Sequence, residues 1–425
     1  MALEDTAEPT VILRKPLKQN VTDDIKAPAN ITNIEIIPSS VKGKFASPDA
    51  VTKWRPPTFT LKQVREKIPA HCFKSNVFIS LGYVLMDLSL ITGLVYFATL
   101  IDTFPDYLYW PAWTFYWIAQ ALPGVGIWIL AHECGHGAFS QYKTVNAVVG
   151  WVLHSIVLIP FFSWKYSHSK HHKGTGHFKK DMVYLPATRT NCEQKYGAPV
   201  TPAEQKPIDP RSHSEESLFQ DTSLTPLVFL ISILLFGFPV YLLNNMGGQN
   251  YGDKWVSHYF PNAPIFEKHQ YNGVVLSNIG LLTWIGIQVA LGFQYGAMVP
   301  VFYFVIPWMQ VNAWLVLITY LQHTDPEIPH YQDKEWDFLR GALATVDRDW
   351  GFLNFFFHHI TDTHVVHHMF STMPFYHAQE ATLAVKDFLG DHYHFDDNNP
   401  IVSVWKSVNT CRFVEDEGDI LFYKY

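Results

Sequence analysis

The stretch NVFISLGYVLMDLSLITGLVYFATLI, which runs from Asn76 to Ile101, decides the class of fold. A helix needs about 20 apolar residues to cross the hydrocarbon core of a bilayer, and this stretch is long enough. None of the apolar stretches shows the sustained period-2 alternation of a lipid-facing barrel strand. The sequence therefore predicts an all-α integral membrane protein. Five further apolar stretches follow, at residues 111–131, 144–162, 223–245, 274–298 and 299–322.

The composition agrees with a chain that is partly embedded in lipid. Of its 425 residues, 48% are hydrophobic and 16% are charged, against about 25% charged residues in ordinary soluble domains. The net charge is −7 and no basic tract is present, which argues against a nucleic-acid partner. The cysteines lack CxxC spacing, so neither a disulfide framework nor a thiolate metal site is predicted. They are Cys72, Cys134, Cys192 and Cys411.

Both ends of the chain are expected to be cytosolic tails. Residues 1–50 are dotted with Pro, Asp and Lys and contain no apolar h-region, which predicts a loosely ordered cytosolic tail and no signal peptide. We expect residues 51–400 to form the membrane domain and residues 401–425 to form a second cytosolic tail. The last five residues, LFYKY, are of the aromatic, lysine-containing kind that can serve as a retrieval signal, although an ordinary hydrophobic end is an equally good interpretation.

Three histidine-rich boxes carry the candidate chemistry. The first reads HECGH at residues 132–136, the second HSKHH at 168–172 and the third HVVHH at 364–368. Positions i, i+3 and i+4 fall on one face of a helix, so each box can direct its imidazoles at one point. Together the boxes exceed the four ligands of one zinc ion, which indicates two metals. Their ligand type suits iron, copper, nickel or zinc. The candidate ligands are His132, His136, His168, His171, His172, His364, His367 and His368.

The first box taken alone has another interpretation. His132, Glu133 and His136 match the H-E-x-x-H pattern of zinc proteases, in which the glutamate acts as a base. An intramembrane zinc protease would leave the other two boxes without a role. A transporter or receptor with a histidine-rich cytosolic surface is a further alternative, and it would consume no oxygen.

Several residues near the boxes are expected to support or extend the centre. His323 closes the last apolar stretch at the level of the boxes and is a candidate ninth ligand. Glu133 is expected to support a ligand or to have a structural role, and Asp362 is expected to orient an imidazole of the third box, as carboxylates beside metal-binding histidines do. His358 is expected to be a ligand or to hold one. The remaining isolated histidines are expected to be hydrogen-bonded or solvated rather than ligating. They are His154, His177, His330 and His377.

Charge and parity predict the topology. The loop 163–222 and the segment before residue 77 are rich in Lys and Arg, whereas residues 102–110 and 294–300 contain none, so the loop is expected in the cytosol. If the boxes share one centre, they lie on one side of the membrane. The stretch 144–162 separates boxes one and two and therefore cannot cross. An even number of crossings must separate boxes two and three, so one of the three later stretches cannot cross either. Because 274–298 and 299–322 form a hairpin at Pro300, we expect 223–245 to be interfacial.

This argument predicts four spanning helices, two interfacial helices and a cytosolic helical cap that carries the boxes. Both termini are then cytosolic. The spans are expected at residues 77–101, 111–131, 274–298 and 299–322, and the interfacial helices at 144–162 and 223–245.

The boxes and their surroundings resemble the membrane-bound fatty acyl desaturase family over about residues 50–400. The similarity is greatest to the oleate Δ12 desaturases of the endoplasmic reticulum, a group that also contains ω-3 desaturases and acyl hydroxylases. Glu133 in the first box and the STMP that follows the third favour the Δ12 type. His359 stands where plant relatives usually have Asn, and we do not count it as a ligand. The motifs that carry the resemblance are AHECGHGAFS, FSWKYSHSKHHKGTGH, TYLQHTDPEIPHY, RGALATVDRDWG and TDTHVVHHMFSTMPFYHAQEAT.

The resemblance implies a function and its requirements. It implies two iron ions held by the box histidines and His323, and dioxygen as co-substrate. The expected reaction introduces a cis double bond into an 18-carbon chain of an acyl-phospholipid or acyl-CoA. Electrons are expected from a separate cytochrome b5 and its NADH-dependent reductase, because no haem or flavin motif is present. The expected location is the endoplasmic reticulum membrane, and a homodimer is compatible with the family.

Overall fold

The computed structural model describes residues 54–196 and 224–424. The tail predicted at residues 1–50 lies outside the described residues, and so does Tyr425. The described chain is mainly helical, with a few strands of two or three residues, which confirms the predicted all-α membrane class.

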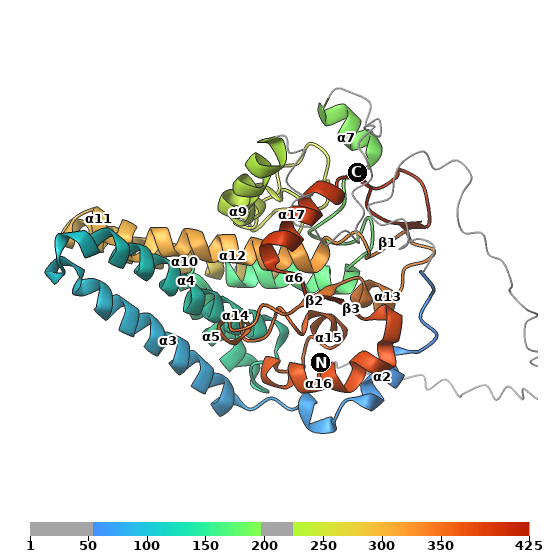
Figure 1. Cartoon of the computed structure of the whole chain (residues 1–425), viewed down its shortest axis with the longest axis horizontal. Coiled ribbons are helices and arrows are strands. Elements are labelled where there is room, and N and C mark those ends of the chain that lie inside the picture. The colour runs from blue at the N-terminus through green and yellow to red at the C-terminus, as the bar shows by residue number, and fades with distance from the viewer. Residues whose placement is uncertain (1–53, 197–223, 425) are drawn as a thin grey trace, which may run out of the picture. The chain divides into compact units, whose positions relative to one another are not determined.

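Long helices form a stem, which extends to the left in Figure 1. Asn76 caps the first of them, because its side-chain oxygen accepts the backbone N–H of Phe78 at 2.9 Å. The second ends at Gly137, whose φ of 76° is the left-handed conformation that favours glycine after a helix. The fourth begins as a short α-turn and a π-helical turn. The stem helices are α3 (Val77–Thr99), α4 (Asp106–His136), α10 (Tyr271–Tyr295), and α11 (Met298–Pro300) continued by η4 (Val301–Val305) and α12 (Ile306–His323).

Within residues 54–196 and 224–424, five helical segments are individually long and apolar enough to cross a membrane. Four of them match the predicted spans within a few residues. The fifth is α9 (Leu224–Asn244), which was expected to lie in the interface, and its length and composition alone also allow it to cross. The count of four spans therefore stays a prediction.

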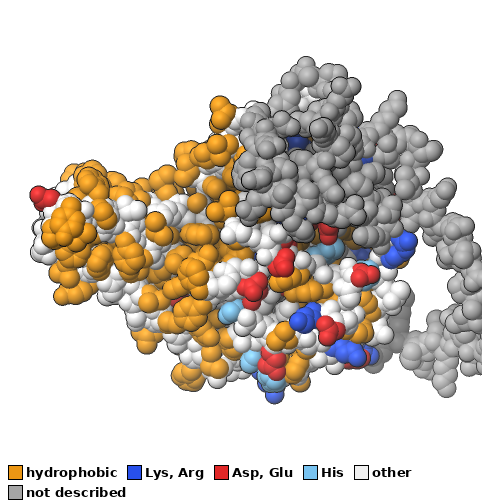
Figure 2. Space-filling view, viewed as in Figure 1, with side chains coloured by type: hydrophobic (Ala, Val, Ile, Leu, Met, Phe, Trp, Pro, Cys, Tyr) orange, Lys and Arg blue, Asp and Glu red, His pale blue; other side chains and the backbone are white. Residues whose placement is uncertain are grey.

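The surface of the stem is strongly apolar. Figure 2 shows hydrophobic side chains over the stem, whereas charged side chains gather on the opposite part of the molecule. Phe78 is 81% exposed and Phe293 is 89% exposed. An apolar surface of this extent is expected where a protein contacts another apolar phase, and lipid supplies that phase here.

The apolar stretch at 144–162 is not one helix. It forms α5 (Lys143–Ile156) and the start of α6 (Phe161–Gly174), which meet at an angle of 106°. Leu158 has a φ of 56° at the bend, and Pro160 cannot donate a hydrogen bond to a continuing helix. The bend directs the second histidine box back toward the end of α4.

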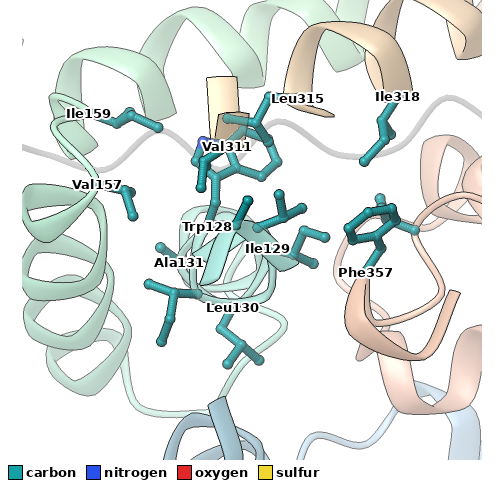
Figure 3. Packing of buried hydrophobic residues seen from close by; sticks show 14 of the residues in the cluster. Trp128, Ile129, Leu130, Ala131, Val157, Ile159, Val311, Leu315, Ile318 and Phe357 are labelled. Carbon is teal, nitrogen blue, oxygen red and sulfur yellow. The ribbon is translucent and has the colours of Figure 1, made fainter. Parts of the chain in front are cut away.

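The core lies between the inner halves of two stem helices. Val311, Leu315 and Ile318 of α12 face Ile129 and its neighbours on α4, as Figure 3 shows. Gly124 permits this approach, because a Cβ at that position would lie 2.7 Å from Val311 Cγ2. The tight contact fixes the ends of both helices at one level, where the stem meets the cap.

The cap contains the remaining elements. A parallel pair of strands joins Val346 to His394, and an antiparallel pair joins His330 to Leu421. The α-helices of this part are α2 (Leu61–Lys67), α7 (Arg189–Tyr196), α13 (Phe338–Leu343), α14 (Leu353–Phe356), α15 (His364–Met369), α16 (Phe375–Leu389) and α17 (Pro400–Thr410). The strands are β1 (His330–Tyr331), β2 (Val346–Arg348), β3 (His394–Asp396) and β4 (Ile420–Leu421). The short 3-10 turns are η1 (Ala70–Phe73), η3 (Lys268–Gln270) and η5 (Gly390–His392), and a further turn, η2 (Ile101–Thr103), links α3 to α4 in the stem.

The C-terminal segment folds against the cap. Val404 and Val408 of α17 are buried, and so are Leu421, Phe422 and Tyr423. Residues 400–424 are therefore an ordered part of the cap in this structure, and the side chains of LFYK are not exposed.

Substitution of Arg348 by Met should destabilise the cap strongly. The guanidinium is 1% exposed, donates from Nη2 to Asp325 at 2.9 Å and contacts the carboxylate of Asp396. Arg348→Met leaves both carboxylates without their cation, and breaking a buried pair in this way costs about 3–5 kcal/mol. We expect a clear fall in the melting temperature of the detergent-solubilised protein.

Arg340→Met is the matched control. Arg340 pairs with Glu335 and Asp337, but its side chain is 20% exposed and that of Asp337 is 56% exposed. Pairs of this kind contribute about 0–1 kcal/mol. Equal melting temperatures for the two variants would contradict a structural role for the buried pair.

Candidate metal centre

The three boxes and His323 meet where the stem joins the cap. Box one is the last turn of α4, box two lies on α6, box three forms α15, and His323 is the last residue of α12. Helical spacing brings the histidines of each box to one face, as the sequence predicted. The structure thus brings together all nine predicted ligands, in two groups.

We call the first group the five-histidine cluster. Each member has a ring nitrogen that lies within 4.8 Å of a ring nitrogen of every other member. The Nε2 atoms of His132 and His136 are 3.2 Å apart, and those of His136 and His168 are 3.0 Å apart. His132 is buried by Trp128 and Trp164, whose rings pack against it. The members are His132, His136, His168, His172 and His367.

The second group, which we call the four-histidine cluster, lies against the first. His171, His323 and His368 direct ring nitrogens to within 4.8 Å of one another. His364 joins them, because its Nε2 lies 3.0 Å from Nε2 of His323. The rings of His172 and His368 stack across the boundary, with centroids 4.1 Å apart. The centre therefore offers two adjacent sites rather than one large site.

The donors fit metal ions. Burial lowers the pKa of His364, His367 and His368 well below the usual range of histidine, with a further contribution from neighbouring imidazoles. These rings are therefore neutral near pH 7 and offer a lone pair. Nε2 of His367 and Nε2 of His368 are buried without a hydrogen-bond partner among the described residues. An unpaired buried acceptor is costly, and a bound cation would satisfy it.

The three residues expected to support the centre lie in different surroundings. Glu133 Oε1 is 3.3 Å from Nδ1 of His132, and its Oε2 accepts the N–H of Phe375 at 3.1 Å. It therefore connects box one to the first residue of α16. Its role toward a bound metal stays a prediction.

Asp362 and His358 have partners outside the nine histidines. The Asp362 carboxylate lies 3.1 Å from Nδ1 of His359 and accepts from Gln379 at 3.0 Å. His358 Nε2 lies 2.8 Å from the carboxylate of Asp87 on α3. In the described residues the His358 contact joins the cap to the stem and the Asp362 contacts lie within the cap, and none of them is with an imidazole of box three.

Two residues that the sequence analysis missed do contact ligands. Asp181 Oδ1 lies 2.5 Å from Nδ1 of His171, and the same carboxylate accepts the N–H groups of Gly176 and Val183. The Thr175 hydroxyl lies 3.2 Å from Nδ1 of His368. Groups placed in this way fix the orientation of metal-binding imidazoles. The sequence did give one signal for Asp181, which is an acidic residue soon after a histidine box. The loop that carries it has no periodicity, so the direction of its side chain could not be predicted.

Asp347 is a further missed residue. It is fully buried on β2 and accepts the N–H of Val365 at 2.8 Å and the hydroxyl of Tyr393 at 2.9 Å. These bonds hold the start of α15 in place, and α15 carries the third box. Of the isolated histidines, His154 lies 3.3 Å from the carbonyl of Trp128 and His177 lies 3.1 Å from Asp333.

Comparison with known proteins supports the same interpretation. Residues 109–397 match the family model described as fatty acid desaturase. The chain is 45% identical to a Delta(12) fatty acid desaturase of Mortierella isabellina, over 89% of this chain and 94% of that protein. It is 42% identical to a Delta(12)-oleate desaturase of Trichosanthes kirilowii, over 85% and 93%. It is 38% identical to an endoplasmic reticulum omega-6 fatty acid desaturase of Brassica juncea, over 90% and 94%.

Asp181→Asn should weaken metal binding without removing a ligand. The amide keeps the size of the carboxylate but loses the charge that orients His171. The loss of such a partner lowers metal affinity or activity by roughly 10–100-fold. Metal titration of the full-length protein with detection by plasma mass spectrometry measures the effect.

Asp333→Asn is the control for this variant. Asp333 is 67% exposed and pairs with Lys180 and His177 rather than with a predicted ligand. If Asp181→Asn bound metal as tightly as Asp333→Asn does, the proposed role of Asp181 would be wrong.

Proposed function

Because the chain belongs to the fatty acid desaturase family, we propose that it introduces the Δ12 double bond into an 18-carbon acyl chain, converting oleoyl to linoleoyl groups. The nine histidines in two adjacent clusters carry the proposal that it is a metal-dependent oxidase of acyl chains. The choice of Δ12 rests on the names of its fungal and plant relatives. The chain matches these relatives over most of their length.

We propose two iron ions as the metals, one in each cluster. All nine donors are imidazoles, and this type of ligand suits iron as well as copper, nickel or zinc, so the family decides the choice. Bound iron would supply the activation of dioxygen that removal of hydrogen from a methylene group requires. Dioxygen is accordingly the proposed co-substrate.

The residues of the chain would hold and shield this centre. The histidines are positioned by four helices whose packing is fixed by the core, which keeps the geometry preorganised. Asp181 and Thr175 hold the rings of His171 and His368. Seven of the nine histidines are at most 7% exposed, and His136 and His168 are partly exposed. A dry site of this kind protects a reactive oxidant from side reactions with water.

The substrate and the electron donors belong to the proposal as well. The apolar stem gives access from the membrane to an acyl-phospholipid or acyl-CoA. Cytochrome b5 and its NADH-dependent reductase are the proposed donors, with the basic cap residues as a docking surface for an acidic partner. We propose the endoplasmic reticulum as the location, with both termini and the boxes cytosolic, because some relatives are named as enzymes of that membrane. A homodimer stays a prediction.

Close alternatives on the same scaffold are an ω-3 desaturase and an acyl hydroxylase. They differ in the carbons that are presented to the metals or in the fate of the oxidised chain. The intramembrane zinc protease is disfavoured by the geometry, because box one does not stand alone but shares its centre with boxes two and three. A histidine-rich transporter is disfavoured by membership of an oxidoreductase family.

Expression in a yeast that makes no polyunsaturated lipids tests the function. We expect linoleate to appear in the total fatty acids, measured by gas chromatography, without any added precursor. His168→Ala removes a member of the five-histidine cluster and should abolish the product, whereas His269→Ala, at an exposed histidine outside both clusters, should leave it unchanged.

The same assay separates the alternatives. Conversion of fed linoleate alone to a triene would support the ω-3 enzyme, and a hydroxylated product would support the hydroxylase. Either result would contradict the Δ12 proposal.

A further inference from the structure

A third group of metal-ligand side chains lies outside both histidine clusters. The turn η1 contributes His71 and Cys72, and helix α16 contributes His377 and Glu380. One donor atom from each residue lies within 4.8 Å of the other three. We call this group the α16 cluster. We propose that it binds a zinc ion, which joins the segment before the stem to the cap.

The fold places these donors together for identifiable reasons. His377 and Glu380 are three residues apart on α16 and therefore share a face of the helix. Cys72 is fully buried, in an apolar cluster with Val64 of α2 and Val385 of α16, which holds η1 against the helix. Figure 1 shows α2 beside α16. The packing thus holds two donors from η1 and two donors from α16 around one point.

Two pairs of donor atoms have a spacing close to that of a zinc site. Zinc bonds of about 2.0–2.3 Å in a tetrahedron separate neighbouring donors by roughly 3.3–3.7 Å. The distance from Cys72 Sγ to His71 Nε2 is 3.7 Å. His71 Nε2 and Glu380 Oε2 are 2.8 Å apart, as a direct hydrogen bond requires, so this pair would open by less than about 1 Å around a cation. The His71 and His377 rings meet edge to face, with centroids 5.3 Å apart.

The chemistry of the set favours zinc over hard ions such as Mg²⁺ and Ca²⁺. Two imidazoles, one thiolate and one carboxylate are all donors that zinc accepts in four-coordinate sites. Hard ions such as Mg²⁺ and Ca²⁺ prefer oxygen donors throughout, which this set does not supply. The side chains of His71 and Glu380 are 54% and 50% exposed, so an ion can reach the site from solvent.

The sequence could not reveal this group. Its cysteines lack CxxC spacing, and His377 was expected to be hydrogen-bonded or solvated. His71 and Glu380 are 309 residues apart in the chain, and only the docking of η1 onto α16 brings them together.

Cobalt substitution tests the proposal in the full-length protein. We expect the purified protein to contain about one zinc per chain in addition to its other metals. Exchange with Co²⁺ should then give a thiolate-to-cobalt charge-transfer band in the near ultraviolet. Neither histidine cluster contains a thiol, so Co²⁺ bound there cannot produce this band. Cys72→Ser should remove both the zinc and the band.

Further variants guard against loss of fold. His377→Asn and Glu380→Gln change ligands that are not fully buried, and both should lower the zinc content and weaken the band. Cys411→Ser is the matched control, because Cys411 lies outside the α16 cluster, and it should retain both signals. The iron content should be the same in all four variants, so failure of the zinc site and failure of the proposed function are distinguishable.

Three results would overturn the proposal. The first is a wild-type protein with no zinc above the content of Cys72→Ser. The second is a cobalt spectrum without the thiolate band. The third is a band that persists in Cys72→Ser.

Discussion

The structure depends on nine imidazoles that meet at the junction of stem and cap, seven of them buried and two partly exposed. Each neutral ring carries one nitrogen that accepts rather than donates, and burial without a partner is unfavourable for such a group. Some rings lie within hydrogen-bond distance of one another, and a bound cation would satisfy the lone pairs that remain. Two adjacent cations would do this, and the division into clusters of five and four histidines follows the geometry of the rings.

The remaining fold serves this requirement. Gly124 lets α4 and α12 approach closely, so that box one and His323 end at the same level. The bend between α5 and α6 returns box two to that level. Asp347 holds α15, and thus box three, through the N–H of Val365. Each box is therefore anchored by packing or hydrogen bonds that do not involve the metals, as a preorganised centre requires.

The sequence was sufficient for features that repeat locally and insufficient for contacts between distant segments. Apolar length predicted the long helices, and i, i+3 and i+4 spacing predicted that the histidines of each box share a face. His323 was found from its place at the end of the last apolar stretch. The contact of Asp181 with His171 depends on the path of an irregular loop, which has no period to read. The expected role of Asp362 at box three rested on nearness in sequence, whereas its carboxylate faces His359 and Gln379. The α16 cluster likewise forms only through long-range docking.

Iron stoichiometry tests the central claim most directly, which is that the nine histidines hold two metals in adjacent sites. Plasma mass spectrometry of the purified full-length protein should give about two irons per chain, and Mössbauer spectroscopy should show both in nitrogen-rich surroundings. His323→Ala, in the four-histidine cluster, should reduce the content to about one while the five-histidine cluster keeps its ion. A wild-type protein with a single iron, or with zinc alone in the histidine clusters, would contradict the account.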